Sequence, residues 1–219
     1  MTAPRILMVA AVQEELAPFV AGSNGGFDLL FTGMGGPHAF HRVRRRLAQN
    51  SYELIVSTGF AGGTRPGFHV GDLVWASEVI EQASGRRWVP ASSFWNSSGN
   101  FVRGPFVTSR GAVATPEGKV QLGNRYGAVA VDMETAAVAE AAHRAGVPWV
   151  GVRAILDPME RTLPVASWQG AFWSLFDPTR WEGLFQLRRA VRTAGRSLAD
   201  GLGEIVREIS MGGEKNGSG

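Results

Sequence analysis

Four charged residues stand inside one of the most apolar stretches of the chain, residues 127–158 (GAVAVDMETAAVAEAAHRAGVPWVGVRAILDP), where one element is expected to end and the next to begin. They are Asp132, Glu134, Arg153 and Asp157. The alanines and valines around them predict a buried helix between two buried strands. A buried charge is costly unless it is paired or used, so these residues predict a polar cluster with a function.

Carboxylates and glycines also follow the other predicted strands at their carboxyl ends. They are Glu14, Glu15, Gly33, Gly35, Gly36, Gly59, Gly62 and Gly63. In open α/β sheets, ligands bind beyond the carboxyl ends of the strands. The sequence therefore predicts a cleft with several carboxylates, one arginine, and glycine turns that let a ligand come close.

The elements that must position these residues alternate between strands and helices. Strands are expected over 5–11, 28–35, 52–63, 70–81, 127–131 and 148–155, and helices over 37–50, 115–124, 132–145 and 177–209. Continuous apolar strands are typical of a sheet covered by helices on both faces, so we predict an α/β fold. Without a dividing linker, residues 1–210 are expected to form a single domain and residues 211–219 a flexible tail. Residues 84–104 lose periodicity and are predicted to form a long functional loop.

Several of these residues also have simpler interpretations. Asp132 is an ordinary helix N-cap as well as a candidate ligand-binding residue. No G-x-G-x-x-G opens a helix after a strand, so a dinucleotide cofactor is not expected. His38 and His41 lie one helical turn apart without a third ligand nearby in sequence, so no metal site is expected either.

The composition narrows the class of protein further. The 219 residues contain no cysteine, which excludes disulfides, thiolate metal sites and a cysteine nucleophile. No apolar run approaches a membrane span or a signal peptide, so we expect a cytoplasmic protein. The net charge is +3, and the densest basic cluster, HRVRRRL (41–47), has the spacing of a solvated helix face. Contact with anionic lipid is a further interpretation of this basic surface, whereas nucleic-acid binding would need interleaved aromatic residues.

The order of these motifs resembles the nucleoside phosphorylase and nucleosidase superfamily, in the branch that holds methylthioadenosine/S-adenosylhomocysteine nucleosidase. The resemblance runs over roughly residues 5–165 and is carried by AAVQEEL, TGFAGG with VGDLV, VAVDMETAAVA and GVRAILD. It implies a three-layer α/β/α sandwich on a mixed, partly barrel-like sheet, a homodimer, and no cofactor.

The resemblance implies cleavage of the N-glycosidic bond of a purine nucleoside. Asp157 corresponds to the general acid that protonates N7 of the departing base, Glu15 to the carboxylate that orients or deprotonates water, and Arg153 to the polar partner of Glu15. Glu134 corresponds to the residue that binds the ribose hydroxyls, with Met133 beneath the sugar. Further substrate-binding positions are expected at Asp132, Gly33, Phe60, Ala61, Gly62 and Val113.

Water is the expected nucleophile, because the first turn (VQEEL) is acidic and TGFAGG contains no arginine before Arg65. Phosphorolysis remains an alternative, as does a nucleoside-binding or storage protein on the same fold.

The substrate is less clearly indicated, since Phe60 and Leu156 stand where the family carries serines. VATPEGK with GAVAVDMET and ILDPMERTLPVA resembles the hopanoid-associated members, which release adenine from adenosylhopane. A large apolar 5′ group would suit a set of aromatic residues that otherwise belongs to the core or a dimer interface, namely Phe60, Trp88, Phe94, Trp95, Trp168, Phe172 and Trp173. Methylthioadenosine, adenosylhomocysteine and futalosine are the alternatives.

Overall fold

A single mixed sheet organises the molecule in the computed structural model, which describes residues 5–22, 26–91, 100–161 and 181–215, with side chains of the last helix for 187–209. The strands within these ranges are β1 (Ile6–Ala10), β2 (Phe27–Phe31), β3 (Leu54–Ser57), β4 (Phe60–Gly63), β5 (Leu73–Glu81), β6 (Arg87–Trp88), β7 (Phe101–Thr108), β8 (Ala130–Asp132) and β9 (Trp149–Asp157). Their order in the sheet is β2-β1-β3-β9-β4-β8-β7-β5-β6.

Strand β9 makes the sheet partly a barrel. It pairs in parallel with β3 and with β4, and it also pairs antiparallel with β5. Because β4 continues through β8 and β7 to β5, the strands β4, β8, β7, β5 and β9 close into a ring. Every residue of β9 is buried, as expected for a strand shared by the barrel and the open part of the sheet.

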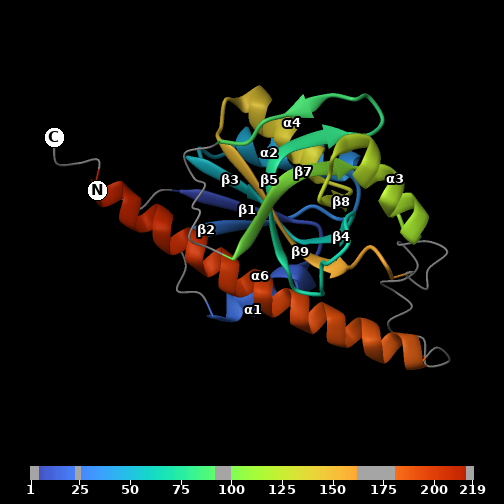
Figure 1. Cartoon of the computed structure of the whole chain (residues 1–219). Coiled ribbons are helices and arrows are strands. Elements are labelled where there is room, and N and C mark those ends of the chain that lie inside the picture. The colour runs from blue at the N-terminus through green and yellow to red at the C-terminus, as the bar shows by residue number, and fades with distance from the viewer. Residues whose placement is uncertain (1–4, 23–25, 92–99, 162–180, 216–219) are drawn as a thin grey trace.

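Helices cover both faces of the sheet, as Figure 1 shows. The helices are α1 (Gln13–Gly22), α2 (Gly36–Leu47), α3 (Pro116–Tyr126), α4 (Thr135–Ala145) and α6 (Trp181–Lys215). On one face α2 packs with α4, and Ala39, Val43 and Ala139 are fully buried. On the other face α1 packs with α6, burying Leu16, Ala194 and Leu198. The predicted fold class, a three-layer sandwich on a mixed and partly barrel-like sheet, is thus confirmed.

Local signals explain where the helices next to the barrel begin and end. Thr115 accepts a hydrogen bond from the Gly118 N–H and caps α3, and Gly127 ends that helix in the left-handed conformation. Gly146 ends α4 in the same way, at φ 68°. Helix α4 begins at Thr135, slightly later than the predicted residue 132, because Asp132 is the last residue of β8.

Three other expectations differ from the structure. Residues 52–63 are predicted to be a strand that runs into a glycine turn, but β4 stands in place of that turn, after a break at Gly59, which has φ 132°. The predicted loop 84–104 contains β6 and the beginning of β7, and residues 92–99 lie outside the described residues. Helix α6 continues to Lys215, beyond residue 209, where the predicted helix ends. The division into one domain and a tail stays a prediction.

No helix in the described part of the chain is both long enough and apolar enough to cross a membrane. Within the same residues, no group of three His, Asp or Glu side chains is arranged to hold a metal ion.

Candidate active site

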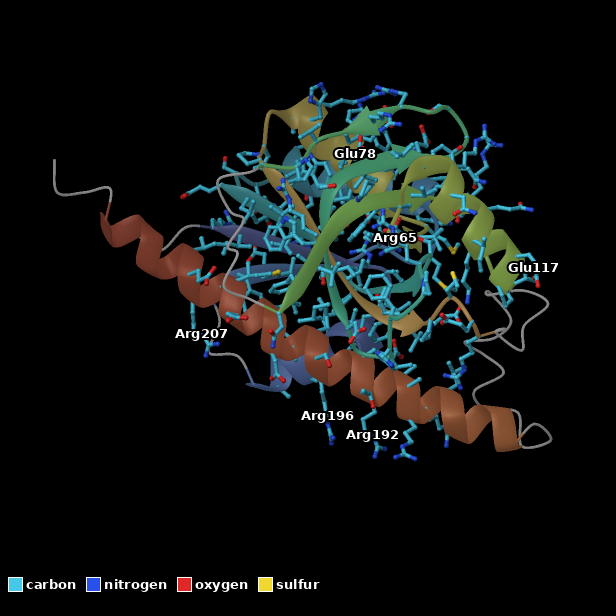
Figure 2. The ribbon with its side chains drawn as sticks, viewed as in Figure 1. Arg65, Glu78, Glu117, Arg192, Arg196 and Arg207 are labelled. Carbon is cyan, nitrogen blue, oxygen red and sulfur yellow. The ribbon has the colours of Figure 1, made fainter. Side chains whose placement is uncertain are left out.

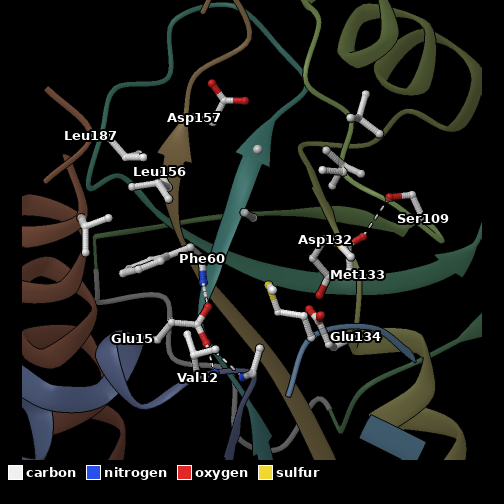
Figure 3. A pocket seen from close by; sticks show the side chains of 18 residues that line it. Val12, Glu15, Phe60, Ser109, Asp132, Met133, Glu134, Leu156, Asp157 and Leu187 are labelled. Carbon is white, nitrogen blue, oxygen red and sulfur yellow. Dashed lines mark hydrogen bonds between the residues drawn. The ribbon is translucent and has the colours of Figure 1, made fainter. Parts of the chain in front are cut away.

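A cavity opens at the carboxyl ends of β1, β7, β8 and β9, and Figure 3 shows the side chains that line it. It contains about 900 Å³ of empty space, part of it open to solvent. The lining residues are Ala11, Val12, Glu15, Met34, Phe60, Ala61, Gly62, Ser109, Ala112, Val113, Val131, Asp132, Met133, Glu134, Leu156, Asp157, Leu187 and Val191. The cavity is therefore mostly apolar with a few carboxylates, the usual composition of a small-molecule site.

Glu15, in the first turn of α1, is held by backbone N–H groups. Its Oε2 accepts hydrogen bonds from Ala11 (2.9 Å) and Val12 (3.1 Å). Its Oε1 accepts one from Phe60 (3.0 Å). Burial raises the pKa of Glu15 above its usual value, although these bonds and the nearby Arg153 charge act in the opposite direction. A buried carboxylate fixed in this way can orient a water molecule and accept its proton.

Gly59 makes this position of Glu15 possible. A Cβ atom on Gly59 would lie 2.6 Å from Glu15 Oε1, and the φ of 132° is one that other residues rarely adopt. The glycine between β3 and β4 is therefore required both by the backbone turn and by the carboxylate beside it.

Glu134 lies between β8 and α4 and points into the cavity near Met133 (Figure 3). Its Oε1 accepts a hydrogen bond from the Gly35 N–H at 2.7 Å, which ties it to the turn after β2. Burial, and secondly the charge of Asp132, raise the pKa of Glu134 to about 8. In the empty cavity this side chain is therefore mostly protonated at neutral pH.

Asp132 and Arg153 form a buried ion pair. Arg153 Nη2 lies 2.8 Å from Asp132 Oδ2 and also donates to Ser57 and Thr135. Asp132 accepts hydrogen bonds from the Thr108 hydroxyl (2.7 Å) and the Thr135 N–H (3.0 Å) as well. Asp132 thus borders the cavity, but its carboxylate is occupied by the protein, and the N-cap position of α4 is Glu134 instead of the predicted Asp132.

Asp157 ends β9 and pairs with a buried lysine that the sequence analysis did not select. Its Oδ2 lies 2.5 Å from Lys119 Nζ in α3. Its Oδ1 is buried and has no hydrogen-bond partner among the described residues. Burial raises the pKa of Asp157 to about 6, while Lys119 acts in the opposite direction. The carboxyl group can therefore hold a proton near neutral pH and release it to a ligand.

The structure brings together most of the predicted site residues. Those that line the cavity are Glu15, Phe60, Ala61, Gly62, Val113, Asp132, Met133, Glu134 and Asp157. The positions of two predicted site residues, Arg153 and Gly33, differ from the expectation. Arg153 hydrogen-bonds with Asp132 instead of Glu15 and acts on Glu15 only through its charge, and it does not line the cavity. Gly33, at φ 75°, forms the turn after β2, and its neighbour Met34 lines the cavity instead.

Of the aromatic residues predicted to surround a 5′ group, one lines the cavity and one lies in the core. Phe60 lines the cavity. Trp88 belongs to the core, where its ring lies 5.5 Å from that of His143. Phe94, Trp95, Trp168, Phe172 and Trp173 lie outside the described residues.

Sequence reasoning missed the part of the site that α6 and α3 contribute. Leu187 and Val191 of α6 line the cavity beside Phe60 and Leu156, and the position of a terminal helix cannot be derived from its own pattern. One signal was present for Lys119, since it is one of only two lysines in the chain and stands in the predicted helix 115–124.

Comparison with known proteins agrees with this geometry. The model of the phosphorylase superfamily matches residues 29–94 and 96–172. A 5′-methylthioadenosine/S-adenosylhomocysteine nucleosidase of Shewanella halifaxensis is 28% identical over 179 residues, covering 67% of this chain and 76% of the relative. The enzyme with the same name from Anoxybacillus flavithermus is 27% identical, covering 69% of this chain and 84% of the relative.

Solved structures share the fold at lower identity. The methylthioadenosine/S-adenosylhomocysteine nucleosidase of Neisseria meningitidis, in complex with methylthio-immucillin-A, has a TM-score of 0.75 at 18% identity, covering 94% of this chain and 99% of that one. The futalosine hydrolase of Helicobacter pylori has a TM-score of 0.74 at 17% identity, covering 94% and 98%.

Proposed function

Because the chain belongs to the phosphorylase superfamily, we propose that its cavity binds an adenosine-type nucleoside and hydrolyses the N-glycosidic bond, releasing adenine. The observation that carries this proposal is Asp157, a buried acid at the cavity with one oxygen that has no partner and a pKa of about 6. A purine is a poor leaving group until it is protonated, and Asp157 can supply the proton.

The other carboxylates suit the sugar. Bond cleavage gives the ribose oxocarbenium character, and anions nearby stabilise that positive charge. In this proposal Glu134 binds the ribose hydroxyls, with Met133 beneath the sugar, and Glu15 activates the nucleophile. The protein is an N-glycosidase. In this proposal Asp157 acts on the base, Glu134 on the ribose and Glu15 on the nucleophile.

Water is the nucleophile in this proposal. Within the described chain, no lysine or arginine side chain lines the cavity, whereas four carboxylates do. The buried cations Arg153 and Lys119 are each already paired with a carboxylate. The lining therefore offers no counterion to a phosphate dianion, so hydrolysis is favoured over phosphorolysis.

The apolar wall contains the site for the 5′ substituent. Phe60, Leu156, Leu187 and Val191 together offer an apolar surface between β4, β9 and α6. This wall supports a substrate with a large apolar 5′ group of the adenosylhopane type. Arg192 and Arg196 lie on the outer face of the same helix (Figure 2), which supports peripheral contact with anionic lipid when such a substrate is delivered.

We expect release of adenine that does not depend on phosphate. The test incubates the protein with adenosine, methylthioadenosine, adenosylhomocysteine, futalosine, and adenosylhopane in vesicles with or without anionic lipid. Each reaction is run with and without phosphate, and the free base and the sugar product are measured. Ribose 1-phosphate as the main product would contradict hydrolysis. Tight binding of a nucleoside without cleavage would instead favour a binding or storage protein.

Assembly into a homodimer is a further part of the proposal. Val89 and Val102 are 75% and 47% exposed and flank residues 92–99 on the side of β6 and β7. Single exposed valines are also common on monomers, so the dimer is proposed from the resemblance to the superfamily, and these two side chains serve to test it.

We therefore expect a dimeric mass by light scattering at micromolar concentration, and a shift toward monomer in Val89→Asp. The matched control is Val20→Asp, which changes a valine that is 42% exposed on α1, on the opposite face of the sheet. A monomeric mass of the unchanged protein would refute the dimer.

A further inference from the structure

Lys119 is buried more completely than a lysine normally is. Its side chain in α3 has no exposed surface, and lysine is almost never fully buried unless it is paired. Its Nζ lies 2.5 Å from Asp157 Oδ2 and donates to the backbone carbonyls of Pro158 (2.9 Å) and Arg161 (2.7 Å). An ammonium group has three N–H donors, so these three partners satisfy it completely.

The two oxygens of the Asp157 carboxyl group consequently differ in their hydrogen-bond partners. Oδ2 is paired with Lys119 and lies near Gly62, which also lines the cavity. Oδ1 is buried, has no partner in the described residues, and belongs to a residue that lines the cavity. An unpaired buried oxygen is costly, which suggests that a ligand completes its hydrogen bonding.

We propose that Lys119 is the positioning residue of the acid: it holds Oδ2 of Asp157 and leaves Oδ1 as the oxygen that gives its proton to the leaving base. This inference rests on the proposed function and adds to it a residue that does not touch the substrate.

The proton and the charge are accounted for in each step. The proton leaves Oδ1 and binds a ring nitrogen of the base, and the electron pair of the N-glycosidic bond goes to the base. Water supplies the hydroxyl group to the sugar, and Glu15 takes the remaining proton of that water. The negative charge that remains on Asp157 is shared with Oδ2, where the Lys119 ammonium stabilises it. After the base departs, Glu15 releases its proton to solvent and solvent returns one to Oδ1.

Few other charges act on Asp157. Arg161, in the turn after β9, is the second cation that favours the ionised carboxylate. The neighbouring strand β4 contributes Gly62, and β8 contributes Val131 at this point, neither of which titrates. Lys119 is therefore the main counterion, because among the described residues only Lys119 is in direct contact with the carboxylate.

A purely structural lysine would hold the turn 158–161 through its two carbonyl bonds without influencing Asp157. The two roles are separated by the titration of Asp157, followed by NMR of the ¹³C-labelled carboxyl group and assigned with Asp157→Asn. In Lys119→Met the midpoint should rise by about 1–3 pH units, the usual effect of losing an adjacent cation. Lys119→Arg keeps the charge and should return the midpoint toward that of the unchanged protein.

Arg125→Met is the matched control, since it removes an exposed cation from the same helix, where Arg125 lies over the Tyr126 ring. It should leave the Asp157 midpoint unchanged. A folded Lys119→Met variant with an unchanged midpoint would overturn the proposal.

Should Lys119→Met fail to fold, the unchanged protein still gives an answer. With only two lysines in the chain, the ¹⁵N resonance of Lys119 Nζ can be identified and followed with pH. The chemical shift of this resonance should change at the pH where Asp157 titrates, and this change should be lost in Asp157→Asn. A chemical shift that does not change at that pH in the unchanged protein would overturn the proposal.

Adenine release measured in parallel tests the proposed function separately. In Lys119→Met, the pKa of the alkaline limb of kcat/KM should rise together with the Asp157 midpoint. Without adenine release from any nucleoside, the proposed function fails while the titration still decides the role of Lys119.

Discussion

Replacing Asp157 by asparagine should lower the turnover of adenine release by about 10²–10⁴-fold, the usual contribution of a general acid. The amide oxygen can take the place of Oδ2 opposite Lys119, and the amide nitrogen then takes the place of Oδ1. It can still donate a hydrogen bond to the base but cannot transfer the proton. We therefore expect kcat to fall much more than KM rises.

The measurement is steady-state release of adenine from the best substrate of the panel, with circular dichroism to verify the fold. Asp200→Asn, an exposed position on α6, is the matched control and should leave both constants unchanged. Unchanged turnover in Asp157→Asn would remove Asp157 as the acid, and with it the proposed mechanism.

The pattern of apolar residues predicted the layers of the fold but not the closure of its barrel. Continuous apolar strands such as β1 and β9 require helices on both faces, which a sequence shows directly. The ring closes through antiparallel pairing of β5 with β9, residues distant in sequence whose pairing no local pattern specifies. Strand β7 was missed in part because Gly104 and Pro105 interrupt it, and α1 because Pro18 lies inside it.

The candidate site was predicted best where the chemistry and the strand ends coincide. Glu15, Glu134 and Asp157 each lie at the beginning or end of an element, so their sequence positions located the cavity. The pairing of side chains could not be predicted in this way. Arg153 lies in a strand whose side chains alternate between faces, and only the three-dimensional arrangement shows that it pairs with Asp132 and not with Glu15.

Burial of three carboxyl groups at the cavity, those of Glu15, Glu134 and Asp157, destabilises the empty protein. Burial raises the pKa of Glu15, Glu134 and Asp157, so each disfavours its ionised form before a substrate arrives. Functional sites commonly contain groups of this kind, whose cost is offset by the rest of the fold. The stability of the empty protein should therefore depend on pH through these residues.

Glu134 shows this dependence most clearly, because its pKa is raised from 4.5 to about 8. Between these values the folded chain binds a proton at Glu134 that the unfolded chain has released, so this residue lowers stability as the pH rises through that window. Glu134→Gln resembles the protonated acid in shape and keeps an oxygen for the Gly35 N–H. We expect the variant and the unchanged protein to be about equally stable near pH 4.5, with the variant more stable by roughly 2–4 kcal/mol at pH 8.

Urea unfolding of the empty protein at several pH values between these limits measures the difference, and Glu53→Gln, at an exposed position, is the matched control. The same Glu134→Gln variant should bind the nucleoside more weakly, because Glu134 can ionise when the ribose hydroxyls donate hydrogen bonds to it, whereas the amide cannot. A higher KM together with a higher stability at pH 8 is thus the expected combination. If Glu134→Gln loses stability at pH 8 relative to the unchanged protein, Glu134 is ionised in the empty cavity and serves to hold the fold together there.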